Sequence, residues 1–283
     1  MSGHFVIGRS QPLRRKPPQP ARVFNLVSAR LFVAAALVAF ASSVAAAADM
    51  PIKATPAAPP YQWTGCYLGL NGGVGASASN FTTTVGPGTY LLVADPGEVT
   101  NDGTGSANAS NLLGGGQAGC NWQTGTLVVG LEGDFDYFRS KSNFYNNTNT
   151  LPTSGNSFVI GQSLTTDYLS TVRPRIGIAA DRNFAYITGG AAFTKANYTE
   201  SYADGAGGTG ITSGSGFLTG WTAGVGWEYA WTDHWMLRFE YLYSAFPTTS
   251  ATGVITGPGG SNALHGSADL VLQVLRAGVN YKF

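Results

Sequence analysis

The chain has 283 residues, of which only 11% are charged, and it contains 39 glycines and many aromatic residues. Soluble domains carry roughly 25% charged residues, so much of this surface need not contact water. After residue 50, however, there is no run of about 18 apolar residues, which excludes a bundle of membrane-spanning helices. Six of the 16 basic residues and no acidic residue precede residue 49. The remainder therefore holds ten basic and 15 acidic residues, a balance that argues against a nucleic-acid partner.

The first 48 residues have the order of a secretory signal peptide. Basic residues precede the apolar stretch 31–40, and small residues ending in alanines 46–48 follow it. The alternative is a membrane-anchoring helix, although the second half of this stretch contains mainly Ala and Ser and is only weakly apolar. Residues 49–62 are rich in Ala and Pro, and we expect an extended periplasmic arm, because a residue before proline is disfavoured in helix.

From residue 63 onward, eight stretches alternate between apolar and polar residues, as strands with one face against lipid do. The predicted strands cover residues 63–77, 111–122, 126–137, 165–180, 184–198, 215–229, 235–243 and 270–283. Four long polar segments, which end near residues 109, 163, 214 and 266, alternate with three tight turns. The sequence therefore predicts an all-β, eight-stranded antiparallel transmembrane β-barrel over residues 63–283, with four long extracellular loops and three short periplasmic turns. An even number of strands places both ends of the chain on the periplasmic side.

The last predicted strand reads LVLQVLRAGVNYKF and alternates up to its final residue. Its apolar face contains Val279 and Tyr281, while Arg276 and Lys282 lie on the polar face. We expect this strand to close the barrel, and Tyr281 and Phe283 to form its closing-strand signal.

Five of the six tryptophans fall near the predicted periplasmic ends of strands. An interfacial girdle of aromatic residues is typical of membrane barrels at this position. The alternative role is stacking against a ligand. The predicted girdle consists of Trp63, Trp122, Trp227, Trp231 and Trp235.

Charged residues on the predicted inward faces come from neighbouring strands and have opposite signs. An eight-stranded barrel has an interior only wide enough to be filled by side chains, and an unpaired charge there would cost several kcal/mol. We therefore expect a network of ion pairs that fills the interior; the alternative is a gated or narrow ion path. The predicted network contains Glu132, Asp134, Asp136, Arg173, Arg175, Glu228, Arg238, Glu240 and Arg276.

Cys66 and Cys120 are the only cysteines. Antiparallel pairing of the first two predicted strands would set them opposite each other on one face, and the periplasm is oxidising, so we predict a disulfide bond. The alternative is a pair of lipid-facing thiols.

The segments WTGCYLGLNGGVG, VVGLEGDFDYF, TVRPRIG, YITGGAAF and LRAGVNYKF resemble the small outer-membrane β-barrel proteins of alphaproteobacteria. These are the porin-family or immunogenic outer-membrane proteins, which are similar to the transmembrane domain of OmpA. The resemblance covers residues 63–283. It implies an abundant envelope protein, often a surface antigen, with no catalytic residues to carry over. Some relatives are described as haem-binding or porin-like.

Catalytic and metal sites find little support in the sequence. Ser267 and Asp269 lie close to His265, but a hydrolase needs its base within hydrogen-bond reach of the nucleophile, and proximity in sequence alone is weak. No His or Cys residues cluster at the spacing of metal ligands. Ligation of haem by His265 with Tyr90 or Tyr202 is a further alternative. We therefore expect neither an enzyme nor a cofactor.

The sequence as a whole predicts an outer-membrane β-barrel with a structural, surface-exposed role in envelope integrity. Two alternatives stay open: a narrow porin-like channel for small solutes or ions, and binding of a ligand such as haem, or of a host, by the loops. The expected partners are outer-membrane lipid and lipopolysaccharide, and the barrel-assembly machinery through the C-terminal strand. We expect a monomer, because a filled interior needs no second subunit.

Overall fold

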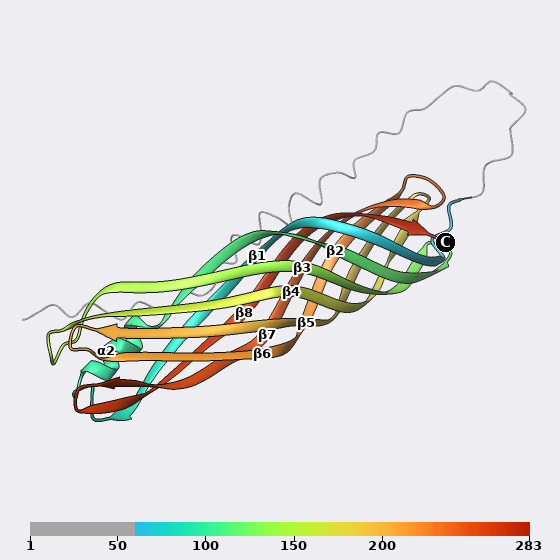
Figure 1. Ribbon diagram of the computed structural model, residues 1–283. Helices are drawn as coiled ribbons and strands as arrows, with labels where there is room; N and C mark the ends of the chain where they lie inside the picture. Colours follow the sequence, from blue (N-terminus) through green and yellow to red (C-terminus); the bar gives the residue numbers. More distant parts are fainter. Residues whose placement is uncertain (1–59) are drawn as a thin grey trace, which may run out of the picture. The chain divides into compact units, whose positions relative to one another are not determined.

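The computed structural model describes residues 60–283, apart from the side chains of residues 147 and 148, and these residues form a closed barrel (Figure 1). Each strand pairs antiparallel with the next, and the last pairs with the first, which confirms the predicted eight-stranded barrel. The elements are β1 (Gly65–Gly88), α2 (Asp95–Asp102), β2 (Gly105–Thr124), β3 (Leu127–Thr150), β4 (Ser157–Ala180), β5 (Asn183–Asp204), β6 (Thr209–Ala230), β7 (Trp235–Gly257) and β8 (Gly260–Lys282). The expected signal peptide over residues 1–48 and nearly all of the expected arm over 49–62 lie outside the described residues. Among the described residues, no helix is both long and apolar enough to cross a membrane.

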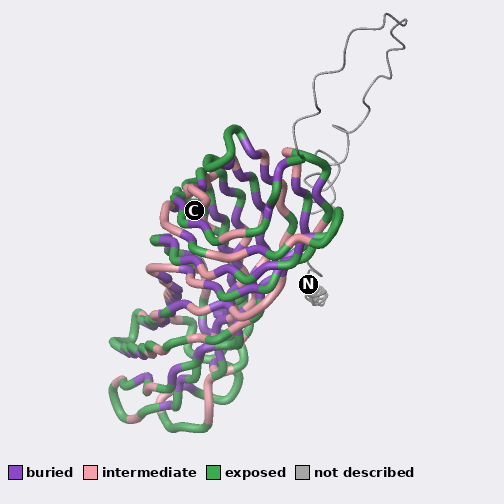
Figure 2. The backbone as a smooth tube through the Cα atoms, turned by 90° about the vertical axis from the view of Figure 1, so that its right-hand side faces the viewer, coloured by how far each residue is buried: buried purple, intermediate pink, exposed green. Residues whose placement is uncertain are grey.

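Buried and exposed residues alternate along the strands, as Figure 2 shows. The alternation follows from strand geometry, because successive side chains point to opposite faces of the sheet. Near one end of the barrel the outward residues are apolar and exposed; Ile178 is 65% exposed and Val279 is 41% exposed. We call this band of outward apolar residues the apolar belt. A surface of this kind is typical of a barrel whose outer wall contacts lipid.

The two ends of the barrel differ. One end, which we call the turn end, has the three short turns at residues 125–126, 181–182 and 231–234, together with the end of β8. The opposite end, which we call the α2 end, has the connections at residues 89–104, 151–156, 205–208 and 258–259. Helix α2 lies in the first of these connections (Figure 1).

The strands are longer than predicted. The segments predicted as long polar loops are mostly strand: β3 continues to Thr150 and β4 begins at Ser157, so only residues 151–156 connect them. The prediction of four long loops is thus corrected, since only the connection at residues 89–104 is long. Polar composition led to the wrong prediction, because strands that leave the membrane do not need an apolar outer face.

The strand lengths divide the barrel into two parts. Strands of 20 to 24 residues, at about 3.3 Å per residue and a tilt near 40°, give a barrel about 50–60 Å tall, whereas the apolar band of a membrane barrel is about 25 Å tall. On β3 the outward residues change from Phe135 and Tyr137 to Arg139 and Lys141. We call the strands beyond this level, toward the α2 end, the projecting part.

Candidate functional site

The interior of the barrel is filled in layers. From the turn end to the α2 end these are an apolar cluster around Trp63 and Phe184, the charged residues predicted from the sequence, and two further apolar clusters around Phe138 and Phe158. The sequence analysis predicted only the charged layer. The cluster around Phe158 lies in segments that the prediction had assigned to loops, whereas the cluster around Phe138 is formed mostly by residues of predicted strands, such as Leu169 and Leu272.

All nine predicted network residues are buried inside the barrel, with exposed fractions of 0–5%. Five carboxylates face four arginines, and every arginine lies within ion-pair distance of at least two carboxylates. We call these nine residues the charge layer. The alternation of β3, β4, β6, β7 and β8 brings them together, because each of these strands contributes side chains from its inward face.

Glu132, like Glu240, lies within ion-pair distance of three arginines of the charge layer. Its Oε1 lies 2.7 Å from Arg173 Nη2 and 2.6 Å from Arg238 Nη2, and its Oε2 lies 3.5 Å from Arg175 Nη1. Glu240 has a similar role on β7, with Arg238 at 2.6 Å, Arg276 at 2.7 Å and Arg173 at 3.2 Å. Glu132 therefore joins arginines from two strands, and Glu240 joins arginines from three strands, into one network.

The remaining members of the charge layer extend it toward both ends. Arg175 Nη1 lies 2.6 Å from Glu228 Oε1, on the turn-end side. Arg276 contacts Asp136 and lies 2.9 Å from Asp134 Oδ2. The ion pairs are buried and bear further hydrogen bonds, as low-dielectric surroundings require.

Two tyrosines also belong to the network. The hydroxyl of Tyr67 donates to Glu132, and that of Tyr186 donates to Glu240 at 3.0 Å. The Arg175 guanidinium lies 4.8 Å from the centre of the Tyr67 ring, a cation–π contact. The network predicted from the sequence contains only charged residues and neither of these tyrosines.

The turn end is closed by the residues that precede β1, and here the structure corrects the predicted girdle. Trp63 is fully buried instead of lying at the outer surface. Its indole N–H donates to the carbonyl of Asp181 at 3.0 Å, its backbone N–H donates to Gln123 Oε1 at 2.7 Å, and its ring lies 5.1 Å from that of Phe184. Because β1 begins only at Gly65, Trp63 does not follow the alternation of the strand, and the chain folds across the opening.

Tyr61 covers Trp63 from outside. The two rings lie 5.0 Å apart, and the Lys282 ammonium lies 4.1 Å from the centre of the Tyr61 ring. The Arg182 guanidinium lies 5.5 Å from the same ring. The other four predicted girdle tryptophans lie at the outer wall or in a turn: Trp122, Trp231 and Trp235 are 46–67% exposed, and Trp227 packs on Phe239 at 5.9 Å.

The α2 end is closed by the long connection. Val99 of α2 and Leu91 are buried in the apolar cluster around Phe158. The Asn262 side chain accepts hydrogen bonds from the backbone N–H of Leu91, at 2.8 Å, and of the residue before it. Asp95 Oδ1 accepts from the backbone N–H of Thr153 at 2.7 Å. These contacts attach the connection to two hairpins.

Tyr90 provides a further attachment at this end. Its hydroxyl lies 2.8 Å from each carboxylate oxygen of Asp204, and the Tyr202 hydroxyl donates to the same carboxylate at 2.9 Å. Burial and the hydrogen bond to Asp204 raise the pKa of Tyr90 to about 12. The hydroxyl therefore remains a donor at every physiological pH.

Glu200 is a buried carboxylate of the projecting part that the sequence analysis missed. It accepts hydrogen bonds from Thr83, from Gln162 Nε2 at 3.2 Å and from the Tyr198 hydroxyl at 3.1 Å. Among the described residues, no Lys or Arg forms an ion pair with it. Burial raises the pKa of Glu200, and the three hydrogen bonds lower it in part. Its position on the inward face of β5 could have been inferred only from the full length of that strand.

Cys66 and Cys120 form the predicted disulfide bond, with their Cα atoms 3.9 Å apart. They lie opposite each other in the register of β1 and β2, near the turn end. The bond joins the first two strands on the outer face.

The residues considered for haem and for hydrolysis are not brought together. His265 is exposed on the outer face of β8, where its Nδ1 lies 3.0 Å from Thr252 Oγ1, whereas Tyr202 is buried inside. The side chain of Asp269 accepts from Asn80 at 3.1 Å and not from His265. Within residues 60–283 no group of three His, Cys, Asp or Glu residues is arranged to hold a metal ion.

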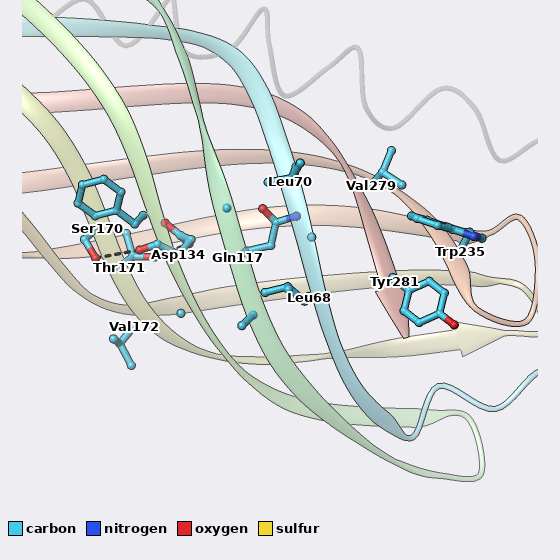
Figure 3. A pocket seen from close by; sticks show the side chains of 15 residues that line it. Leu68, Leu70, Gln117, Asp134, Ser170, Thr171, Val172, Trp235, Val279 and Tyr281 are labelled. Atoms are coloured by element: carbon cyan, nitrogen blue, oxygen red, sulfur yellow. Dashed lines mark hydrogen bonds between the residues drawn. The ribbon is translucent and has the colours of Figure 1, made fainter. Parts of the chain in front are cut away.

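The outer wall contains a shallow groove of about 720 Å³ over β1, β2 and β3 (Figure 3). Leu68, Leu70 and Val279 line it together with the two aromatic residues Trp235 and Tyr281. On the inner side of the same wall, Thr171 donates to Asp134 at 2.7 Å, which is the dashed line in Figure 3. The groove lies in the apolar belt and is therefore part of the lipid-facing surface.

Comparison with known proteins gives consistent matches. A family model described as an outer membrane protein beta-barrel domain matches residues 32–283. The 31 kDa outer-membrane immunogenic protein of Brucella melitensis biotype 1 is 29% identical over 259 residues, which cover 89% of this chain and 98% of the relative. The 25 kDa outer-membrane immunogenic protein of Brucella canis is 28% identical, with coverages of 89% and 97%.

Solved structures with a similar fold include the outer membrane protease OmpT from Escherichia coli and the outer membrane protein OprG from Pseudomonas aeruginosa. OmpT has a TM-score of 0.44 at 9% identity and covers 80% of this chain and 99% of its own. OprG has a TM-score of 0.39 at 12% identity, with coverages of 79% and 98%.

Proposed function

Because the chain belongs to the outer membrane protein β-barrel domain family, as the strand segments predicted, we propose that it has a structural, surface-exposed role and contributes to the integrity of the outer membrane. The observation that carries this proposal is the filled interior. The charge layer occupies the middle of the barrel, Trp63 closes the turn end, and α2 with Leu91 closes the α2 end. A barrel filled in this way forms a rigid element of the membrane, and its interior leaves no wide path for solutes.

The proposed orientation places the turn end in the periplasm and the α2 end outside the cell. Membrane barrels of bacteria have short periplasmic turns and longer extracellular connections. The turn end has only short turns together with the end of the chain, whereas the longest connection, residues 89–104, lies at the α2 end. The projecting part then stands above the cell surface. The relatives from Brucella are described as immunogenic, which supports a surface-exposed role for this chain too.

The proposed partners follow from the same orientation. Outer-membrane lipid and lipopolysaccharide would contact the apolar belt and its aromatic rims. The barrel-assembly machinery would bind the C-terminal strand. There Tyr281 faces outward, and its ring centre lies 5.1 Å from that of Trp235 and 5.4 Å from that of Phe283. The chain would act as a monomer, because a filled interior needs no second subunit, and not as an enzyme.

The alternative function, a narrow channel, requires a continuous path of water through the interior. Planar-bilayer recording of the refolded protein distinguishes the two functions. We expect no steady conductance from the unaltered protein, because all four interior layers would have to open. A steady conductance that disappears in Arg173→Ala or Glu132→Ala would contradict the structural role and establish transport.

Envelope integrity is tested in the bacterium. A strain that lacks the gene should become more sensitive to sodium dodecyl sulfate, and the wild-type gene should restore resistance. A gene that encodes Asp167→Ala, which removes an exposed carboxylate and leaves the filled interior intact, serves as the matched control and should also restore it. If the deletion strain is as resistant as its parent, the proposed role is wrong.

A further inference from the structure

Pairing between β2 and β3 ends partway along the two strands. The pairs run from Thr124 and Leu127 at the turn to Gly114 and Tyr137, and none is formed beyond them among the described residues. Both strands nevertheless continue toward the α2 end, over residues 105–113 on β2 and 138–150 on β3. The first stretch still pairs with β1 and most of the second with β4, so each has one free edge. We call these two edges, which face each other in the projecting part, the open seam.

The register shows which backbone groups face the seam. The N–H of Phe283 donates to the carbonyl of Cys66 at 3.1 Å, so the backbone of Cys66 faces β8. Cys66 and Cys120 are therefore a non-hydrogen-bonded pair, in accord with their Cα separation of 3.9 Å, and the backbone of Cys120 faces β3. Since the β1–β2 register has no shift, every second residue of β2 faces the same way. In the open seam these residues are Ser106, Asn108, Ser110 and Leu112.

The same argument holds for β3. Leu131 is the partner of Cys120, so its backbone groups face β2. The β3–β4 register shifts between Tyr137 and Ser140, but buried and exposed residues still alternate along β3 up to Ser142. The residues of β3 whose backbone groups face the seam are Arg139, Lys141, Asn143 and Tyr145. The seam thus presents two rows of N–H and C=O groups that pair with no neighbouring strand.

The two edges differ in how they are protected. Proteins usually protect a free strand edge with a charge, a proline or a bulge. The edge of β2 over residues 105–113, GSANASNLL, has no charge and no proline, and its register has no bulge. The edge of β3 has two cations, Arg139 and Lys141, which are both exposed and lie two residues apart on the outer face. Arg139 has only a distant partner, Asp167, at 3.8 Å.

We propose that the open seam binds an extended polypeptide segment of another protein, which adds a strand to the free edge of β2 and carries acidic residues at alternate positions. A row of alternating N–H and C=O groups is complementary to an extended backbone. Side chains at alternate positions of the added strand lie on the outer face, next to Arg139 and Lys141. These two cations select acidic residues there and disfavour a second copy of this chain, whose corresponding β3 residues are basic.

The test uses the full refolded protein in detergent micelles and a fluorescent nine-residue peptide with Glu at alternate positions and Val or Thr between them. Asn108→Pro removes one N–H that faces the seam and leaves the ladder to β1 intact, whereas Asn108→Ala removes the same exposed side chain and keeps the N–H. We expect fluorescence anisotropy to show binding that Asn108→Pro weakens about tenfold and Asn108→Ala leaves unchanged.

A second pair of variants tests the charges. Arg139→Glu with Lys141→Glu should weaken binding at least tenfold, while Lys195→Glu, a reversal at an exposed residue of β5 away from the seam, should leave it unchanged. Hydrogen exchange should show new protection at residues 106–112 when the peptide is bound. The shift between unheated and boiled protein on a detergent gel verifies that every variant is folded.

Three results would overturn the proposal. One is the absence of peptide binding to the folded protein. Another is binding that depends on Arg139 and Lys141 but not on the N–H of residue 108. The two cations would then recognise negative charge alone, as on a phosphate or saccharide anion, and no strand would be added to β2. The third is a dimer in sedimentation experiments that Asn108→Pro dissociates, because a second copy would then occupy the seam.

Discussion

Glu132 is one of the two carboxylates on which the buried charges converge, since it lies within ion-pair distance of Arg173, Arg175 and Arg238. In Glu132→Ala these arginines keep their charges but lose a shared partner inside the barrel. Breaking a buried pair in this way costs about 3–5 kcal/mol. We therefore expect the free energy of unfolding, measured by urea titration in lipid vesicles, to fall by about that amount.

The matched control is the exposed pair of Arg139 and Asp167. Asp167→Ala removes a carboxylate in water, and we expect a change within about 0.5 kcal/mol. Equal effects of the two substitutions would show that the charge layer is hydrated and does not behave as a buried network.

Glu200 provides a prediction about pH. Because burial raises its pKa in the folded protein above the value of about 4.3 in an unfolded chain, the folded state keeps a proton that the unfolded state has released. Stability therefore falls as the pH rises from about 4.3 to the raised pKa, by at most about 1.4 kcal/mol per pH unit. Glu200→Gln should remove this fall, so that the variant is more stable than the wild type at pH 8 and similar at pH 4.

Urea titrations of both proteins at several pH values measure this difference. All other titrating groups are shared, so the difference between the two curves isolates Glu200. Parallel curves would mean that the carboxylate is ionised at the same pH in both states and that its three hydrogen bonds outweigh its burial.

At the scale of elements, the disulfide bond joins β1 to β2 across a sequence separation of 54 residues. The chain-entropy model gives about 4 kcal/mol for closing a loop of this length. Replacing both cysteines by serine should lower the urea midpoint, and reduction of the wild type should lower it to the same extent. A reductant that shifts the double variant as much as the wild type would show that the effect does not come from the bond.

The strands were predictable where the membrane determines their outer face. The alternation in β3, with Glu132, Asp134 and Asp136 opposite Phe135 and Tyr137, required a strand with one face against lipid and one inside. Beyond Tyr137 the outer face contacts water, so the alternation of apolar and polar residues disappears. There the strand is stabilised by apolar residues on its inward face, and these are too few in any short stretch of sequence to predict a strand.

The closures of the two ends show a different limit. Trp63 is an aromatic residue near the end of a predicted strand, as a girdle residue would be. It is buried instead of lying on the outer face because β1 begins only at Gly65. Its position depends on Asp181, in the turn between β4 and β5, and on Gln123, near the end of β2. Contacts between distant segments of this kind leave no periodic signal in the sequence, whereas the disulfide did, because both cysteines lie within strands of fixed register.

At the scale of the whole molecule, the height of the barrel predicts which outward residues can be reached from outside the cell. The strands exceed the apolar band by about a factor of two, so Lys141 and Lys195 stand above the membrane, Ile187 lies in the apolar belt and Trp231 lies at the turn end. Single cysteines at these positions should react with a membrane-impermeant maleimide in intact cells only in Lys141→Cys and Lys195→Cys. The two native cysteines form a disulfide bond and therefore do not react with the maleimide.

Maleimide labelling of permeabilised cells distinguishes a residue on the periplasmic side of the membrane from a residue covered by lipid. Trp231→Cys should become reactive only when the outer membrane is opened, since the turn end then meets the reagent, while Ile187→Cys should stay protected by lipid in both conditions. Labelling of Trp231→Cys in intact cells, with Lys141→Cys protected, would invert the proposed orientation and leave the barrel itself unchanged. Labelling of Ile187→Cys would instead contradict the apolar belt, since a residue in contact with lipid cannot also react with a reagent confined to water.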